Sequence, residues 1–476
     1  MVRALSALSI LAVSLTLAVA GCGGDGGDAG TDAASFAPQS AAFFVTFATE
    51  GEEWESAEEL YRRFPAAERA RREVLEDLAE EDLDWDRDVR PALGPELALV
   101  GFGEGEGDVV ALTQPADREA LDRLVAKSDG ELTYEMVEDW AVLGETAADV
   151  GAFREALGDE SLADTDEWND ATDDLPEDAL VVGYVNGDSV NRSFGDRVGG
   201  IGGGNGLPIG GRFPSIGFAV GAQDDGVRLD AEIEGAETDL PDAYEAALPD
   251  ELPAGALAYV SWHDAAASIR ETLRQAGDTN PEVDRTVAQL ELALGLSLER
   301  DVLPLFAGEG ALALYPGAVG SATPDVALVL EVEDEERALA ILDGIVERAA
   351  GFGVVTAAPD VTVGDVEARV VAVEGMEILY AAWDGKLLAT TSEAALAAIE
   401  AGGETLADDP SFLSARDSSA APSETVGFAY VNIGAIVDEF GSGEEEAENF
   451  EPLGPLFLYG TSDDDGLAVG GFLAVE

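Results

Sequence analysis

The residues best suited to chemistry are scarce in this chain, which has one cysteine, Cys22, and one histidine, His263. A disulfide needs two cysteines, a zinc cluster needs several Cys or His ligands, and a Cys nucleophile needs a histidine base beside it. The composition therefore excludes a disulfide framework, a Cys/His zinc cluster and a Cys/His catalytic pair. His263 follows the apolar segment Tyr259–Trp262, and we expect it at a strand end or helix cap rather than in catalysis.

The glycine run Gly199–Gly206 has the composition of a phosphate-binding loop. Such a loop ends in Lys and then Ser or Thr at the start of a helix, whereas Leu207 and Pro208 follow here. The two lysines, Lys127 and Lys386, stand outside any Ser-x-x-Lys motif. We therefore expect a flexible surface loop, no Ser/Lys nucleophile and no cofactor.

Alternate acids at Asp84, Asp86 and Asp88 have the spacing of a calcium-binding loop. Such a loop also needs Gly at its sixth position and Glu at its twelfth, and these positions are Val89 and Pro95. We therefore expect a solvated turn here and no metal site.

The chemistry of Cys22 is indicated by the residues that precede it. Arg3 supplies a positive start, Ala4–Ala20 is an uncharged apolar run, and small residues lead to Gly21-Cys22. This order resembles the lipobox of bacterial lipoproteins, in which the Cys is acylated and the preceding peptide is removed. The resemblance implies a signal peptide at residues 1–21 and an extracytoplasmic protein anchored to the bacterial cell membrane by lipidated Cys22. The alternatives are an ordinary cleaved signal with an accidental Cys, or an uncleaved anchor.

The rest of the composition describes a folded acidic body on a flexible tether. Residues 22–35 begin with alternating Gly and Asp and have no apolar periodicity. Apolar residues make up 46% of the chain, which suffices for a substantial core. With 25 basic and 98 acidic residues the net charge is −73, which excludes nucleic acid as a partner and a polybasic contact with anionic lipid.

The body carries an internal duplication. The opening segments at Pro38 and Pro253 are similar over ten residues at an offset of 253 − 38 = 215. Further pairs follow in the same order: Leu83–Pro91 with Leu296–Pro304, Leu162–Asp164 with Leu406–Asp408, Tyr184–Asn186 with Tyr430–Asn432, and Asp224–Gly226 with Asp464–Gly466. Five collinear matches predict two related repeats.

Each repeat is expected to open with a strand, continue with two helices and several strands, and close with a hairpin at Asp-Gly. The irregular order of strands and helices predicts an α+β fold that is internally duplicated, with mainly antiparallel sheets and packed helices. The expected boundaries are 36–236 for the first repeat, 237–252 for a connector and 253–476 for the second repeat.

Aromatic residues mark the opening strand of both repeats. Phe43, Phe44 and Phe47 lie in the first, and Tyr259 and Trp262 occupy matching places in the second. Two such strands could line a cleft between the repeats that accepts an apolar ligand or a peptide. The alternative is that these rings belong to the core on both faces of a buried strand.

Three segments of the second repeat carry a family resemblance: Leu252–Val260, Asp301–Leu314 and Leu406–Phe412. They resemble the bacterial envelope family known as domain of unknown function 3352, best over Leu252–Val437 and more faintly over Phe36–Val190. The resemblance implies a secreted or lipid-anchored protein and brings no activity and no catalytic residues.

Two functions are consistent with these observations. The first is a non-enzymatic binding or scaffold module of the cell envelope, whose partners are the membrane, through the lipid anchor, and an envelope protein or apolar ligand. The alternative is a carboxylate-dependent hydrolase acting on envelope polymers, since 98 acids make close carboxylate pairs inevitable. The same abundance singles out no catalytic residue.

Overall fold

The fold is that of a computed structural model, which describes residues 32–80, 82–103, 108–128, 130–176, 178–187, 189, 215–234, 242–317, 323–373, 375–441, 449–462 and 466–476. Cys22, with the expected signal peptide and most of the tether, and the glycine run Gly199–Gly206 lie outside these residues. No helix within the described ranges is long and apolar enough to cross a membrane.

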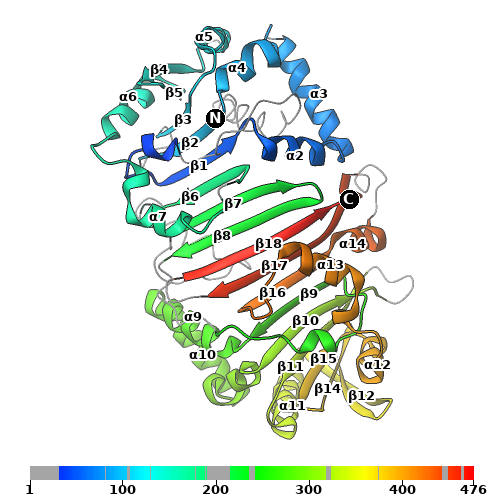
Figure 1. The fold of residues 1–476 in the computed structure, drawn as a ribbon. Helices are drawn as coiled ribbons and strands as arrows, with labels where there is room; N and C mark the ends of the chain where they lie inside the picture. The colour runs from blue at the N-terminus through cyan, green and yellow to red at the C-terminus, as the bar shows by residue number, and fades with distance from the viewer. Residues whose placement is uncertain are drawn as a thin grey trace.

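The described strands form one antiparallel sheet (Figure 1). Those of the first repeat are β1 (Phe43–Ala48), β2 (Glu96–Gly101), β3 (Val109–Thr113), β4 (Thr133–Val137), β5 (Trp140–Gly144), β6 (Val181–Val185), β7 (Ser215–Gln223) and β8 (Gly226–Glu234). Those of the second repeat are β9 (Ala258–His263), β10 (Glu309–Tyr315), β11 (Asp325–Glu331), β12 (Val355–Val363), β13 (Val366–Val373), β14 (Met376–Trp383), β15 (Lys386–Thr390), β16 (Gly427–Asn432), β17 (Leu453–Ser462) and β18 (Gly466–Val475).

The pairings place the strands in a nearly palindromic order. It runs β4-β5-β3-β2-β1-β6-β7-β8 and then β18-β17-β16-β9-β10-β11-β15-β14-β13-β12. β1 and β9 begin 258 − 43 = 215 residues apart, which is the offset of the sequence match. The predicted duplication and the α+β class are therefore confirmed, whereas the repeat boundaries stay a prediction.

The two repeats join through β8 and β18. Asp230 pairs with Gly470, and these two residues hold the same place in their strands, because 470 − 230 and 466 − 226 both equal 240. A local twofold axis therefore passes through this pair. Figure 1 shows β8 and β18 side by side at the centre of the molecule, with the repeats on either side.

Helices lie against both the outer and the central strands of each repeat. The helix pair after β1 is α2 (Glu52–Tyr61) and α3 (Pro65–Glu80), and the pair after β9 is α9 (Ala265–Thr279) and α10 (Pro281–Leu294). Pro65 and Pro281 are the first residues of α3 and α10, where a missing N–H costs nothing. The other helices used below are α5 (Arg118–Lys127), α6 (Ala147–Ala156), α7 (Asp166–Thr172), α11 (Glu335–Gly351), α12 (Glu393–Ala401), α13 (Pro410–Ser419) and the short helices η1 (Ala34–Phe36), η4 (Leu248–Asp250) and η7 (Leu406–Asp408).

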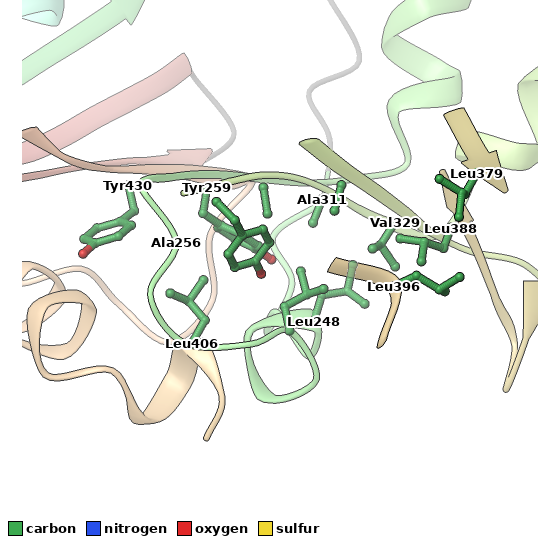
Figure 2. Packing of buried hydrophobic residues seen from close by; sticks show 14 of the residues in the cluster. Leu248, Ala256, Tyr259, Ala311, Val329, Leu379, Leu388, Leu396, Leu406 and Tyr430 are labelled. Carbon is green, nitrogen blue, oxygen red and sulfur yellow. The ribbon is translucent and has the colours of Figure 1, made fainter. Parts of the chain in front are cut away.

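We call the two sides of the sheet face A, which carries Phe44 and Tyr259, and face B, which carries Phe47 and Val260. Face A is packed under α6 and α7 in the first repeat and under α12 and α13 in the second. Figure 2 shows the second of these cores, with Tyr259, Ala311 and Val329 pointing from the sheet toward Leu248, Leu396 and Leu406. The core clusters of face B lie over the outer strands, under α5 in the first repeat and under α11 in the second.

Candidate functional site

Face B of the central strands is apolar, although no large core cluster forms on it there. β8 illustrates the pattern, because Val227, Leu229, Ala231 and Ile233 lie on face B while the charged residues between them lie on face A. In an antiparallel sheet we expect the side without packed helices to be polar. Here the side under α7 and α13 carries the charges of β8, and the opposite side carries its apolar residues.

The apolar character of face B continues across both repeats. Directly paired residues point to the same face, so one row can be followed from strand to strand. Most of its side chains are half-buried, whereas Val260 is 41% exposed and Leu312 is 38% exposed. The row contains Phe47, Val181, Val220, Leu229, Gly471, Leu458, Ala429, Val260 and Leu312.

On face A most of the large aromatic residues of the central strands are buried. Five of these aromatic side chains are at most 1% exposed: Tyr184, Tyr259, Tyr430, Phe457 and Phe472. The two faces therefore differ in covering at the aromatic residues, and on β8 they differ in residue type as well. Face B of the central strands is thus a half-exposed apolar surface.

Three aromatic rings flatten this surface by lying over glycines of the neighbouring strand. Phe43 covers Gly101, Phe218 covers Gly183, and Trp262 covers Gly310, so that a Cβ on any of these glycines would overlap a ring. Ring-over-glycine pairs of this kind hold two strands in register. Because the three rings lie flat over these glycines, they add apolar surface to face B without projecting from the sheet.

Adding a methyl group under one of these rings should destabilise the protein. In Gly183→Ala the new Cβ displaces the Phe218 ring, and overpacking of this kind costs ~1–3 kcal/mol. Gly221→Ala is the matched control, because its Cβ meets nothing closer than Arg228 Cβ at 3.9 Å. Denaturant titration of both variants is the measurement, and equal midpoints would contradict the packing described.

The five aromatic residues singled out from the sequence fall on both faces. Phe43, Phe47 and Trp262 lie on face B, whereas Phe44 and Tyr259 are core residues of face A. Six strands separate β1 from β9, so the two opening strands belong to two separate places on the sheet rather than to one cleft. Contact of these residues with an apolar ligand stays a prediction.

A buried glutamate in each repeat escaped the sequence analysis. Glu309 accepts hydrogen bonds from the backbone N–H of Ala247 at 2.8 Å and of Leu248 at 3.1 Å, at the start of η4. Glu96 accepts one from Thr46 Oγ1 at 2.7 Å. Burial raises the pKa of both carboxyls. The signal was available, because 309 − 96 = 213 is the offset of the neighbouring sequence match.

These glutamates do not form an acid–base pair. They lie in different repeats, on β2 and β10, where Glu96 is bonded to Thr46 of β1 and Glu309 to the connector before the second repeat. In the described chain they are the two carboxyls with a raised pKa. Their bonds instead fasten local segments, which for Glu309 is the stretch leading into the second repeat.

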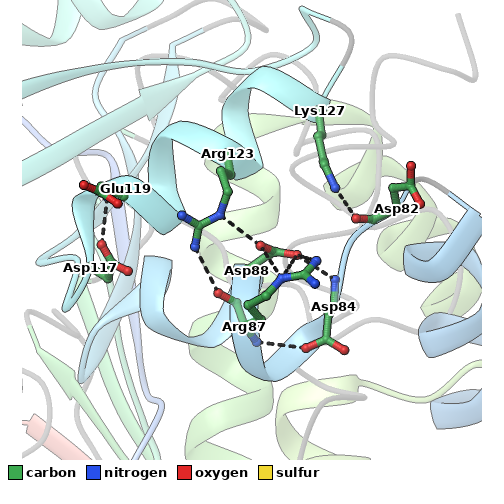
Figure 3. Close-up of polar contacts among 8 residues, drawn as sticks. All are labelled: Asp82, Asp84, Arg87, Asp88, Asp117, Glu119, Arg123 and Lys127. Carbon is green, nitrogen blue, oxygen red and sulfur yellow. Dashed lines mark hydrogen bonds and ion pairs between the residues drawn. The ribbon is translucent and has the colours of Figure 1, made fainter.

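The acids at Asp84 to Asp88 differ from the solvated turn expected there. Asp88 is fully buried and accepts from Asp84 N at 3.0 Å, from Arg87 Nε at 3.1 Å and from Arg123 Nε at 3.1 Å (Figure 3). The hydrogen bond from Arg87 holds the pKa of Asp88 well below its usual range. The carboxylate thus stabilises the chain turn between α3 and β2.

The second repeat repeats this arrangement. Asp301 accepts from Ser297 N at 2.8 Å and pairs with Arg300 and Arg337, and the pKa of Asp301 is lowered by the backbone bond first and by Arg300 second. Asp301 also lines a cavity of about 560 Å³ beside α11, in which Lys386 pairs with Glu251. These charged groups are held by partners within the protein.

Comparison with known proteins gives a family and little else. A family model described as protein of unknown function (DUF3352) matches residues 151–444. The search of curated proteins found no match. Among solved structures, crystal form IV of TP0453 is 12% identical, with 48% of this chain and 81% of that chain covered at a TM-score of 0.26. Crystal form III of TP0453 is 15% identical, with 45% and 74% covered at a TM-score of 0.24.

Proposed function

Because the chain belongs to the family of proteins of unknown function DUF3352, whose description assigns no activity, we propose a function from the site itself. The protein is a non-enzymatic binding module of the cell envelope, anchored through lipidated Cys22. It holds the acyl chain of a lipid on face B of its central strands. The observation that carries this proposal is the half-exposed apolar row from Phe47 to Leu312.

The chemistry of face B favours an apolar ligand over a polar one. Covering apolar surface is worth ~25 cal/mol per Å², and every side chain of the row is apolar. Nine adjacent strands at ~4.8 Å spacing make the row ~38 Å long, which accommodates an extended chain.

The expected anchor supports the choice of a lipid. Cys22 lies 32 − 22 = 10 residues before Asp32, where the described chain begins. Ten extended residues span at most ~36 Å, so the body would stay close to the bilayer that supplies the ligand. The carboxylate-dependent hydrolase has no comparable observation in its favour, since Glu96 and Glu309 lie in separate repeats and each has its own hydrogen-bond partners.

Val260→Lys tests the proposal. Val260 lies near one end of the exposed row, and a lysine there puts a charge against the ligand, so bound lipid should fall at least about tenfold. Met376→Lys is the matched control, because Met376 is 52% exposed at the start of β14, away from the row. The measurement is native mass spectrometry of the full-length lipidated protein, released from detergent, with the lipid adduct lost on denaturation.

Either of two results would overturn the proposal. If the native mass spectrum of the wild-type protein contains no lipid adduct, then face B binds no lipid. Equal lipid occupancy in Val260→Lys and Met376→Lys places the ligand elsewhere on the molecule.

A further inference from the structure

Strands β13 and β14 pair over five of the eight residues in each strand. Their ladder runs from Val373 opposite Met376 to Arg369 opposite Tyr380 and then stops. Continuing the register would pair Val366–Ala368 with Ala381–Trp383. No such pairs form, and on their other edges Val366–Ala368 pair with β12 and Ala381–Trp383 pair with β15. The hairpins β12–β13 and β14–β15 therefore splay apart at this end.

A cavity of about 980 Å³ occupies the splay. Both separating strand ends line it, Val366–Arg369 from β13 and Ala382–Asp384 from β14. Trp383 adds an aromatic side chain that packs on the core beneath. The cavity thus lies at the end of the two strands where their ladder has stopped.

Backbone geometry makes this cavity suited to an extended peptide. In an antiparallel strand the N–H and C=O of alternate residues point to the same neighbour. Each three-residue end therefore directs backbone groups into the gap, where the partner strand has left the ladder. An inserted strand would satisfy those groups on both of its sides, which gives affinity independent of its side chains.

The charge around the cavity selects the kind of peptide. Five carboxylates line it, from Asp360, Asp365, Glu367, Asp384 and Glu400. The one cation of the lining, Arg369, already forms an ion pair with Asp343 of α11. The remaining field is negative and attracts Lys and Arg side chains.

We propose that the splay between β13 and β14 binds an extended basic peptide segment, which adds as a strand and sets its cations against Glu367 and Glu400. The site belongs to the second repeat alone, because the first repeat passes from α5 directly to β4 without a counterpart of β12–β13. It is separate from face B of the central strands and independent of the lipid proposal.

The test is fluorescence anisotropy of a labelled peptide of alternating Lys and Val, titrated with the full-length protein in detergent. Two peptide controls separate strand addition from simple charge attraction. The same peptide with N-methylated backbone amides keeps its charges and loses its donors, and a Glu/Val peptide reverses the charge. We expect the N-methylated peptide to bind at least about tenfold more weakly than its parent.

Two charge reversals locate the site. Glu367 is exposed on β13, so the Glu367→Lys variant should fold normally. Its affinity for the Lys/Val peptide should be at least about tenfold lower than that of the wild-type protein. Glu160→Lys makes the same change at an exposed position of the first repeat and should leave affinity within about twofold. Equal binding of the N-methylated peptide, or equal loss in both variants, would show general attraction to an acidic protein and overturn the proposal.

Discussion

A proline at position 229 is expected to destabilise both repeats at once, by ~3 kcal/mol or more. Leu229 lies in the middle of β8, between Val220 of β7 and Gly471 of β18. Proline removes a ladder N–H there and forces the backbone away from one neighbour. Because β8 and β18 are the strands that join the repeats, Leu229→Pro breaks the sheet at its centre.

Side-chain contacts reinforce the same junction. Arg63 of the first repeat donates to the carbonyl of Val475 at 2.6 Å and to that of Asp224 at 2.6 Å. Val475 in turn donates its N–H to Asp225 O at 2.8 Å. The end of β18 is therefore tied to the turn between β7 and β8, and we expect the halves to unfold together.

The measurement for Leu229→Pro is denaturant unfolding followed by far-UV circular dichroism and by tryptophan fluorescence. Thr133→Pro is the control, because Thr133 is the first residue of the edge strand β4, where proline is tolerated. Wild-type protein should give coincident transitions by both probes. A variant in which one repeat keeps its wild-type midpoint would show that the junction carries no cooperativity.

Local signals in the sequence account for most of the strands. The Asp-Gly turn at Gly226 predicted a hairpin from Ile216–Ala222 and Val227–Ile233, against Ser215–Gln223 and Gly226–Glu234 in the structure. Turn chemistry and alternating apolar residues act within a few positions, so each strand could be predicted without knowledge of its neighbours. The constant offset between Pro38 and Pro253 allowed the strands predicted for the first repeat to be predicted in the second repeat as well.

Strand order could not be predicted in the same way. Asp230 pairs with Gly470, which lies 240 residues later in the chain, and no local sequence pattern indicates that pairing. The β12–β13 hairpin was missed as well, because Val355–Val363 contains Pro359 and β13 matches nothing in the first repeat. Pro359 fits an edge strand, and being an edge is a property of the whole sheet.

The candidate site was predicted in part. Phe43, Phe44 and Phe47 drew attention as an aromatic-rich strand, but β1 is apolar on both sides. Without polar alternation the sequence cannot say which rings are core and which lie on the other face. Register supplies the answer, since Phe44 pairs with Val100 and Tyr184 of the face A core, whereas Phe47 pairs with Leu97 on face B.

That assignment predicts a large loss of stability for Phe44→Ala, ~3–5 kcal/mol. Phe44 is fully buried and meets the Trp168 ring edge-on, with centroids 5.2 Å apart. Truncation leaves a cavity beneath α7 that the surrounding sheet cannot close, because Val100 and Tyr184 are fixed in the ladders on either side. Phe352→Ala is the control, since Phe352 is 68% exposed and its loss should change stability by no more than ~0.5 kcal/mol.

Phe44→Leu then separates a core role from a ligand contact. Leucine keeps most of the apolar volume, so stability should recover to within ~1.5 kcal/mol of wild type, and lipid occupancy should equal that of wild type because Phe44 faces away from face B. Denaturant midpoints and native mass spectra of the same preparations measure both quantities. Loss of the lipid adduct in Phe44→Leu at unchanged stability would move the ligand to face A and contradict the assignment of faces.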